Sequence, residues 1–469
     1  DRWKFFASYS HEKREGGRPF GSVWQGGGGA IAMELVEPID YVTHDILAGF
    51  HYADALTNFN FQASSSLFRN NTDSLTFQTP YRAAAANGLA AGAFTQGRFA
   101  LYPDNEAYNV KGEYARRLPD FMNGRFTAVL SLGTSRQDDK LLPYTTLAGV
   151  NVPNVAGDNW HTTDSLSRKS AGARIDTRLL DLGLTLNPTQ ALNVKAKARY
   201  YETRNHTEFL ACNPNASYID ADPNTAGNQP GVISGYGCSG VWGRLINDGS
   251  ANGGSLLMGT NATQAGNLVI RNIPFDYRRI NLGFSADYRI DPSSSLNGGY
   301  EREIYLRDHR ERDKTWEDKL RLGYVTRGLP DTTLRMSFEH AERRGSSYHT
   351  HHPYASFTSG YLVEMPSGAG ANVQSWVVHM NSGLRKYDLS DRSQSTLNGR
   401  VNYMPREDLD LGLSAQFRDT RYPDAAYGRR DRQTQHAINL DADYQPSAER
   451  SIFAYYSWSA ARMKQRGVP

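Results

Sequence analysis

The sequence predicts an all-β protein, a large transmembrane antiparallel β-barrel that occupies residues 1–469 as a single domain. Three observations support this prediction. Apolar and polar side chains alternate with a period of two, short turns that contain proline alternate with long polar connections, and no run of about 18 apolar residues could form a transmembrane helix. A transmembrane strand needs only about 9–11 residues, half of which face a polar lumen, so a barrel can be hydrophilic on average.

The composition agrees with a barrel and argues against nucleic-acid binding. The chain contains 27 Tyr and 43 Gly, and tyrosine suits the boundary between lipid and water because its ring is apolar and its hydroxyl polar. There are 52 basic and 49 acidic residues, a formal net charge of +3. A nucleic-acid-binding protein would instead carry a marked basic surplus. We therefore expect outer-membrane lipid, and no nucleic acid, as a partner of this chain.

The alternation of apolar and polar residues defines the strands. Leu282, Phe284 and Tyr288 alternate with Asp287 and Arg289, and side chains at i and i+2 share one face of a strand. Similar alternation recurs at 192–200, 409–417 and 438–444. The apolar set, which includes Leu411, Leu413 and Phe417, is expected to face lipid. Fifteen strands are predicted, at residues 3–13, 44–53, 57–69, 107–117, 125–137, 172–186, 191–206, 277–290, 295–308, 316–328, 332–344, 392–404, 408–420, 434–445 and 450–462.

The connections separate a membrane barrel from a soluble sandwich. Proline presets a turn and cannot donate to a strand ladder, and all the proline turns fall at the same end of the predicted strands. These prolines are Pro119, Pro188, Pro292, Pro330, Pro405 and Pro446. Long loops are predicted at 14–43, 70–106, 138–170, 207–275 and 345–391, with a shorter connection at 421–433. Short periplasmic turns that alternate with long extracellular loops are typical of outer-membrane barrels.

The two ends of the chain suggest a trimmed barrel. Asp1, Arg2 and Trp3 already begin a strand, so we expect the chain to be mature and trimmed at its N-terminus. Fifteen is an odd number, whereas bacterial single-chain barrels have even numbers of strands. Residues 466–469 add no closing strand that ends in an aromatic residue. We therefore expect strands to be missing at the C-terminal end.

Several sequence boxes occur in an informative order. Residues 34–52 read ELVEPIDYVTHDILAGFHY, preceded by REGGRPF at 14–20. Residues 384–391 read LRKYDLSD and lead into a strand, a proline turn, a second strand and then RYPD at 421–424. The final pair of strands contains DADYQPSAERSIFAYYSW. This ordered set resembles the MtrB/PioB family of decahaem-associated outer-membrane proteins.

The resemblance implies a barrel of about 26 strands, at the upper end of the usual range. It implies that the barrel encloses a periplasmic decahaem c-type cytochrome and commonly docks an outer-surface multihaem cytochrome. Haem c is then carried by the partner, and this chain itself binds no cofactor. The chain lacks the Cys-x-x-Cys pair that some relatives have near the N-terminus.

The two cysteines do not form a haem-attachment motif. Cys212 and Cys238 both lie in the predicted 207–275 loop, and neither belongs to a C-x-x-C-H sequence. A metal or redox pair is one interpretation, and we favour the other, a loop disulfide in an oxidising compartment.

Other polar groupings have plain interpretations. His349, His351 and His352 could hold a transition metal, but they lie in a Ser/Gly/Tyr-rich loop without carboxylates at metal-site spacing. The four glycines at 26–29 lack the Lys-Ser/Thr of a phosphate-binding loop. Paired catalytic carboxylates could lie among a group of charged residues at one strand end, but an extracellular surface fits this group better. Its members are Arg302, Glu303, Arg307, Asp308, Arg310, Glu311 and Arg312. No catalytic or metal residue is therefore predicted.

Three functions compete. The first is a sheath whose polar lumen is filled by a multihaem cytochrome, so that electrons cross the outer membrane. The second is a general or solute-selective porin, and the third, an outer-membrane enzyme, lacks a concentration of catalytic groups. The predicted lumen-facing contacts with the partner are Lys195, Lys197, Arg199, Asp287, Arg289, Arg400, Asp410, Asn439 and Asp441.

Overall fold

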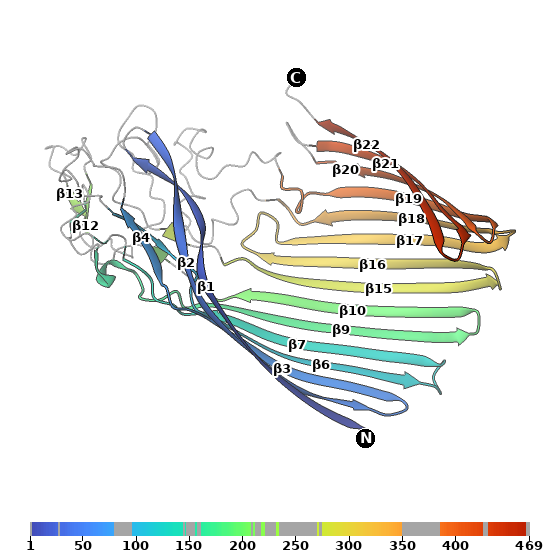
Figure 1. Ribbon diagram of the computed structural model, residues 1–469, viewed down its shortest axis with the longest axis horizontal. Helices are drawn as coiled ribbons and strands as arrows, with labels where there is room; N and C mark the ends of the chain where they lie inside the picture. The colour runs from blue at the N-terminus through green and yellow to red at the C-terminus, as the bar shows by residue number, and fades with distance from the viewer. Residues whose placement is uncertain are drawn as a thin grey trace.

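The fold is built around one long antiparallel sheet. The computed structural model describes residues 2–26, 29–78, 96–143, 146, 155–156, 161–207, 210–211, 217–220, 231–233, 270–271, 274–348, 385–424 and 430–465. Within them the main sheet has fifteen strands in the order β1-β2-β3-β6-β7-β9-β10-β15-β16-β17-β18-β19-β20-β21-β22. Figure 1 shows these strands side by side in a curved sheet, with β1 and β22 at opposite edges. The prediction of a large all-β antiparallel fold is confirmed.

The strands are long enough to extend beyond a bilayer. A crossing needs about 9–11 residues, and the shortest strand of the main sheet has 13. The fifteen strands are β1 (Trp3–Gly26), β2 (Gly29–Ala53), β3 (Thr57–Asn70), β6 (Asn105–Leu118), β7 (Gly124–Gln137), β9 (Ala173–Thr189), β10 (Leu192–Asn205), β15 (Asp276–Asp291), β16 (Ser294–Asp308), β17 (Lys314–Leu329), β18 (Thr332–Gly345), β19 (Arg392–Arg406), β20 (Leu409–Arg421), β21 (Arg430–Ser447) and β22 (Arg450–Gln465).

Short elements occupy parts of the connections. They are the pair β4 (Ser74–Gln78) and β5 (Gln96–Ala100), the pair β11 (Leu210–Ala211) and β14 (Ile270–Arg271), the three strands β8 (Val155–Ala156), β12 (Ser217–Asp220) and β13 (Gly231–Ile233), and the 3-10 helix η2 (Thr163–Ser165). Among the described residues, no helix has the length and apolar character to cross a membrane.

The six predicted proline turns all lie at one end of the sheet. They join β6 to β7, β9 to β10, β15 to β16, β17 to β18, β19 to β20 and β21 to β22, and the long connections leave from the other end (Figure 1). Three of the six prolines, Pro188, Pro405 and Pro446, lie inside β9, β19 and β21 instead of in the turns themselves. The strand register shifts beside each of them, because proline has no N–H to donate to the ladder.

The turn between β2 and β3 uses an aspartate instead of a proline. The Asp54 carboxylate accepts hydrogen bonds from the Tyr52 hydroxyl at 2.8 Å and from the backbone N–H groups of Leu56 at 2.8 Å and Thr57 at 2.6 Å. The Tyr52 hydroxyl, followed by these two N–H groups, lowers the pKa of Asp54. The side chain thereby fixes the turn through its own acceptors.

The predicted loop at 14–43, including the box at 14–20, was wrong. β1 and β2 continue as a two-stranded hairpin, paired from Trp3 with Tyr52 to Gly26 with Gly29. Glycines and a proline interrupt the alternation there, but strands of a hairpin tolerate them where one edge is unpaired. The predicted loop at 70–106 also contains structure, the pair β4–β5. That residues 1–469 form one barrel domain stays a prediction, because several ranges lie outside the described residues.

The two faces of the sheet differ in polarity. Leu282, Phe284 and Leu413, predicted to face lipid, are 48%, 55% and 45% exposed on one face. Among the described residues, the only buried apolar side chains are Leu101, Ala341, Leu389 and Tyr422. A single-layer sheet with an exposed apolar face needs lipid to cover it, and the opposite polar face then lines the lumen.

Candidate functional site

The predicted contact residues of β10 and β15 lie on the polar face. Directly paired residues of antiparallel strands share a face. Lys195 pairs with Ser285, and Asp287 is two residues from Ser285 along β15, so these side chains point the same way. The Lys195 Nζ atom lies 2.9 Å from a carboxylate oxygen of Asp287. The predicted residues Lys197, Arg199 and Arg289 share this face by the same alternation.

The contact residues of β19, β20 and β21 form a second group. Arg400 pairs with Ser414, which pairs with Asn439. The Arg400 guanidinium lies 3.1 Å from the Asp441 carboxylate, and the Asn439 Nδ2 atom donates to the Ser414 Oγ atom at 3.1 Å. The remaining predicted residue, Asp410, pairs directly with Asp443 on the same face.

One continuous row of pairs connects the two groups. From Lys195 it runs through Ser285, Gly299, Arg321, Glu339, Thr396 and Arg418 to Gln435. All nine predicted contact residues therefore lie on one face. The structure does not bring them into one cluster, because β16, β17 and β18 separate the two groups.

Sequence reasoning did not place the acidic residues Glu301, Glu303 and Glu339 on the polar wall between the two groups. The Arg321 guanidinium lies 2.6 Å from the Glu339 carboxylate and 3.4 Å from that of Glu301. The Asn281 Nδ2 atom donates to Glu303 at 3.0 Å and to Glu301 at 3.3 Å. The only sequence signal was position in the alternation, and consecutive charges at 301–303 hide it.

The box LRKYDLSD folds against the loop-side end of the polar face, over its described residues 385–391. Leu389 is fully buried, and its carbonyl oxygen accepts a hydrogen bond from the Arg312 Nη1 atom at 2.7 Å. The same nitrogen lies 2.6 Å from the Asp391 carboxylate, and the Arg343 Nε atom donates to the Ser390 carbonyl at 2.9 Å. Two largely buried arginines therefore pin this segment to the sheet.

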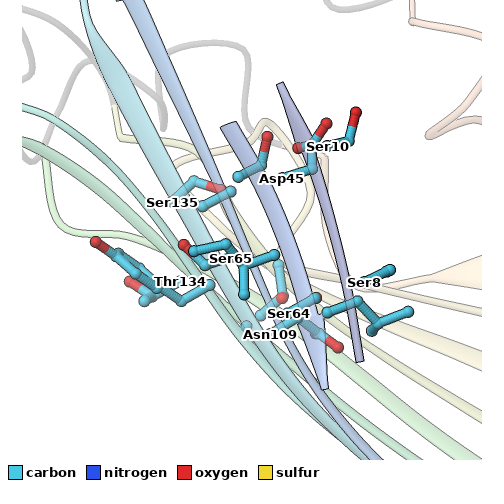
Figure 2. A pocket seen from close by; sticks show the side chains of 15 residues that line it. Ser8, Ser10, Asp45, Ser64, Ser65, Asn109, Thr134 and Ser135 are labelled. Atoms are coloured by element: carbon cyan, nitrogen blue, oxygen red, sulfur yellow. The ribbon is translucent and has the colours of Figure 1, made fainter. Parts of the chain in front are cut away.

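A shallow hollow of about 440 Å³ lies across the first strands of the sheet. Figure 2 shows small polar side chains from β1, β2, β3, β6 and β7 around it, and Asp45 is the one carboxylate in its lining. Short side chains such as Ser8 and Ser64 leave this part of the wall recessed.

No metal centre emerges from the described residues. Within them, no group of three or more His, Cys, Asp or Glu side chains could hold a metal ion. The cysteines Cys212 and Cys238 lie outside the described residues, as do His349, His351 and His352. The disulfide between the two cysteines stays a prediction.

A comparison with protein families decides the assignment. The model described as "outer membrane beta-barrel porin, MtrB/PioB" matches residues 1–468. The chain belongs to this family. The MtrB/PioB resemblance of the sequence boxes and the outer-membrane localisation are confirmed.

One relative and two solved structures are similar to this MtrB/PioB chain at low sequence identity. Outer membrane protein MtrB of Shewanella baltica (strain OS185) is 23% identical over 472 residues, covering 99% of this chain and 53% of the relative. The chain thus spans about half the length of that relative. The FrpB iron transporter of Neisseria meningitidis (F3-3 variant) is similar with a TM-score of 0.47 at 10% identity. The match covers 100% of this chain and 59% of the transporter chain. The copper transporter OprC has a TM-score of 0.45 at 8% identity, with coverages of 99% and 62%. These structural similarities are too distant to indicate a function.

Proposed function

We propose that this MtrB/PioB barrel sheathes and positions a periplasmic multihaem c-type cytochrome, so that electrons cross the outer membrane through the enclosed protein. An outer-surface multihaem cytochrome is proposed as a second partner. The chain is not itself an enzyme in this proposal. It supplies a wall around the cofactors and a fixed depth in the membrane.

The observation that carries the proposal is the mixed charge of the polar face. Pores select ions with rings of one sign. Here cations and anions neutralise each other within the wall, as in the Arg321 pairs with Glu301 and Glu339 and the Arg400 pair with Asp441. A mixed, hydrogen-bonding wall suits the surface of a folded protein, whose own charges are also mixed and need partners when water is excluded.

The chain's own residues provide position and insulation. The exposed apolar face, with Leu282 and Leu413 among its members, cannot leave the hydrocarbon without a large cost, so it fixes the depth of the barrel. Haem c, bound in the partner, would supply the electron transfer. Neither Cys212 nor Cys238 belongs to a C-x-x-C-H sequence, which leaves covalent haem attachment to the partner.

A porin is the alternative, and the family's description as a porin favours it. Unpaired lumenal cations such as Lys197 would then bias the pore toward anions. The two functions differ in what the empty barrel does.

Reconstitution separates the two functions. Full-length barrel is placed in liposomes that hold a reduced dye, with or without the cytochrome, and a non-permeating oxidant is added outside. The sheath proposal expects dye oxidation only with the cytochrome present. If the empty barrel supports oxidation as well as the complex does, the proposal fails and the porin replaces it.

A further inference from the structure

The charges of the polar face are unevenly neutralised. Six cations gather on β6, β7, β10 and β15, between the proline-turn end and the middle of the strands. We name them the lumenal basic patch: Arg117, Arg125, Lys195, Lys197, Arg199 and Arg289. Strand register places them together, since Arg117 pairs with Arg125 and the row continues through Thr185 to Lys195.

Two members of the patch have acidic partners in the wall. Lys195 lies 2.9 Å from Asp287, and Arg199 lies 3.9 Å from Asp181. The other four, Arg117, Arg125, Lys197 and Arg289, make no ion pair within the described part of the chain. Elsewhere on this face Arg321 and Arg400 each have carboxylates within reach. Arg335 and Arg418 make no ion pair among the described residues either, but they lie apart from each other, on β18 and β20.

The arrangement of the unpaired cations favours an external anion. Arg117 and Arg125 stand directly opposite each other, and like charges in that position destabilise a sheet. Lys197 pairs with Gly183 on one side and Gly283 on the other. Because glycine has no side chain, the wall is recessed around the Lys197 ammonium and another molecule can approach it.

We infer that the lumenal basic patch is the docking surface for an acidic surface of the enclosed protein and sets its orientation at the proline-turn mouth. This inference rests on the proposed sheath function. When a folded protein fills the lumen, water is excluded, and buried cations without partners would be costly. Carboxylates on the enclosed protein remove that cost. The patch, with six cations and two acidic partners in the wall, carries a positive surplus that also attracts an acidic protein before contact.

The test compares two double variants of the full-length protein purified with its haem-bearing partner. Arg125→Gln with Lys197→Gln removes two positive charges from the patch. Ser8→Glu with Ser64→Glu lowers the charge of the polar face by the same amount, at the recessed hollow of Figure 2. A charge-conserving variant, Arg125→Lys with Lys197→Arg, serves as the rescue. Heat-modifiable gel mobility reports folding, and haem absorbance per barrel reports the partner.

The patch variant is expected to bind the partner about two- to thirtyfold more weakly at low salt, the range for two screened ion pairs. The difference should shrink as salt is raised. The serine variant and the rescue should retain the partner. Equal losses of the partner in the glutamine and the glutamate variants, or no loss in either, would overturn this inference. The proposed sheath function would still stand in both cases.

A second measurement applies if the glutamine variant does not fold. The unaltered complex is washed at increasing salt, and release of haem-bearing partner is recorded. Release that steepens with salt supports an electrostatic contact, and release independent of salt overturns it. If the unaltered barrel carries no haem-bearing partner, the proposed function itself fails.

Discussion

Arginine substitutions at two neighbouring positions of β20 test the assignment of faces. Leu413 lies on the apolar face, 45% exposed, and pairs with Val401 and Leu440. It is four residues beyond Leu409, where the strand begins, which is about 14 Å along the strand at about 3.4 Å per residue. A tilt of about 40° reduces this to about 10 Å of depth, near the middle of an apolar band about 25 Å tall.

The expected costs of the two substitutions differ. Leu413→Arg places a charge near the midplane and should destabilise the barrel by about 2–4 kcal/mol. Ser414→Arg points to the lumen and should cost about 1 kcal/mol, mainly because the hydrogen bond from Asn439 to Ser414 is lost. Equilibrium urea unfolding of the full-length protein in lipid vesicles measures both values. Equal destabilisation at the two positions would refute the assignment of lipid and lumen faces.

Three further predictions concern single side chains. Gly49→Ala should destabilise the barrel by about 1–3 kcal/mol in the same urea assay, because the added Cβ would lie 2.2 Å from the Phe61 backbone oxygen. Gly399→Ala, whose Cβ would meet nothing within 4 Å, should be nearly neutral, and equal effects would contradict this. Arg312→Met removes the cation that holds the segment 385–391 against the sheet through Asp391 and the Leu389 carbonyl oxygen. Hydrogen exchange and proteolysis of this segment should therefore become faster. Unchanged protection of the segment would show that Arg312 does not hold it in place. Because the pKa of Asp54 is lowered in the fold, its hydrogen bonds stabilise the turn fully above the ordinary aspartate pKa of about 3.9, and this stabilisation is lost as the pH falls through the lowered pKa. Asp54→Ala should therefore make the free energy of unfolding less dependent on acid pH. An identical pH profile for the variant and the unaltered protein would refute this prediction.

The strands could be predicted because their signal is local. Alternation with a period of two and the proline turns lie within single hairpins, and they located all fifteen strands of the main sheet. The signal failed at 14–43, where Pro19 and several glycines interrupt the alternation although the backbone still pairs. The side-chain pattern therefore predicted a strand end earlier than the one that the backbone hydrogen bonds define.

The pattern of charge neutralisation could not be predicted. Lys195 and Asp287 are 92 residues apart in the chain, and Arg400 and Asp441 are 41 apart. Their pairing depends on the register between strands, and the long connection from β10 to β15 gives no local signal for it. Alternation assigned these residues to the correct face. Only the register shows which cations have acidic neighbours and that Arg117 and Arg125 join the lumenal basic patch.

The most direct measurement of the central proposal is the haem content of the full-length protein purified from its native membrane. The sheath proposal predicts c-type haem absorbance that elutes with the barrel in a constant ratio through successive purification steps. It also predicts little ion conductance in planar bilayers while the partner is present. A folded barrel that elutes without haem and conducts ions freely would contradict the proposal.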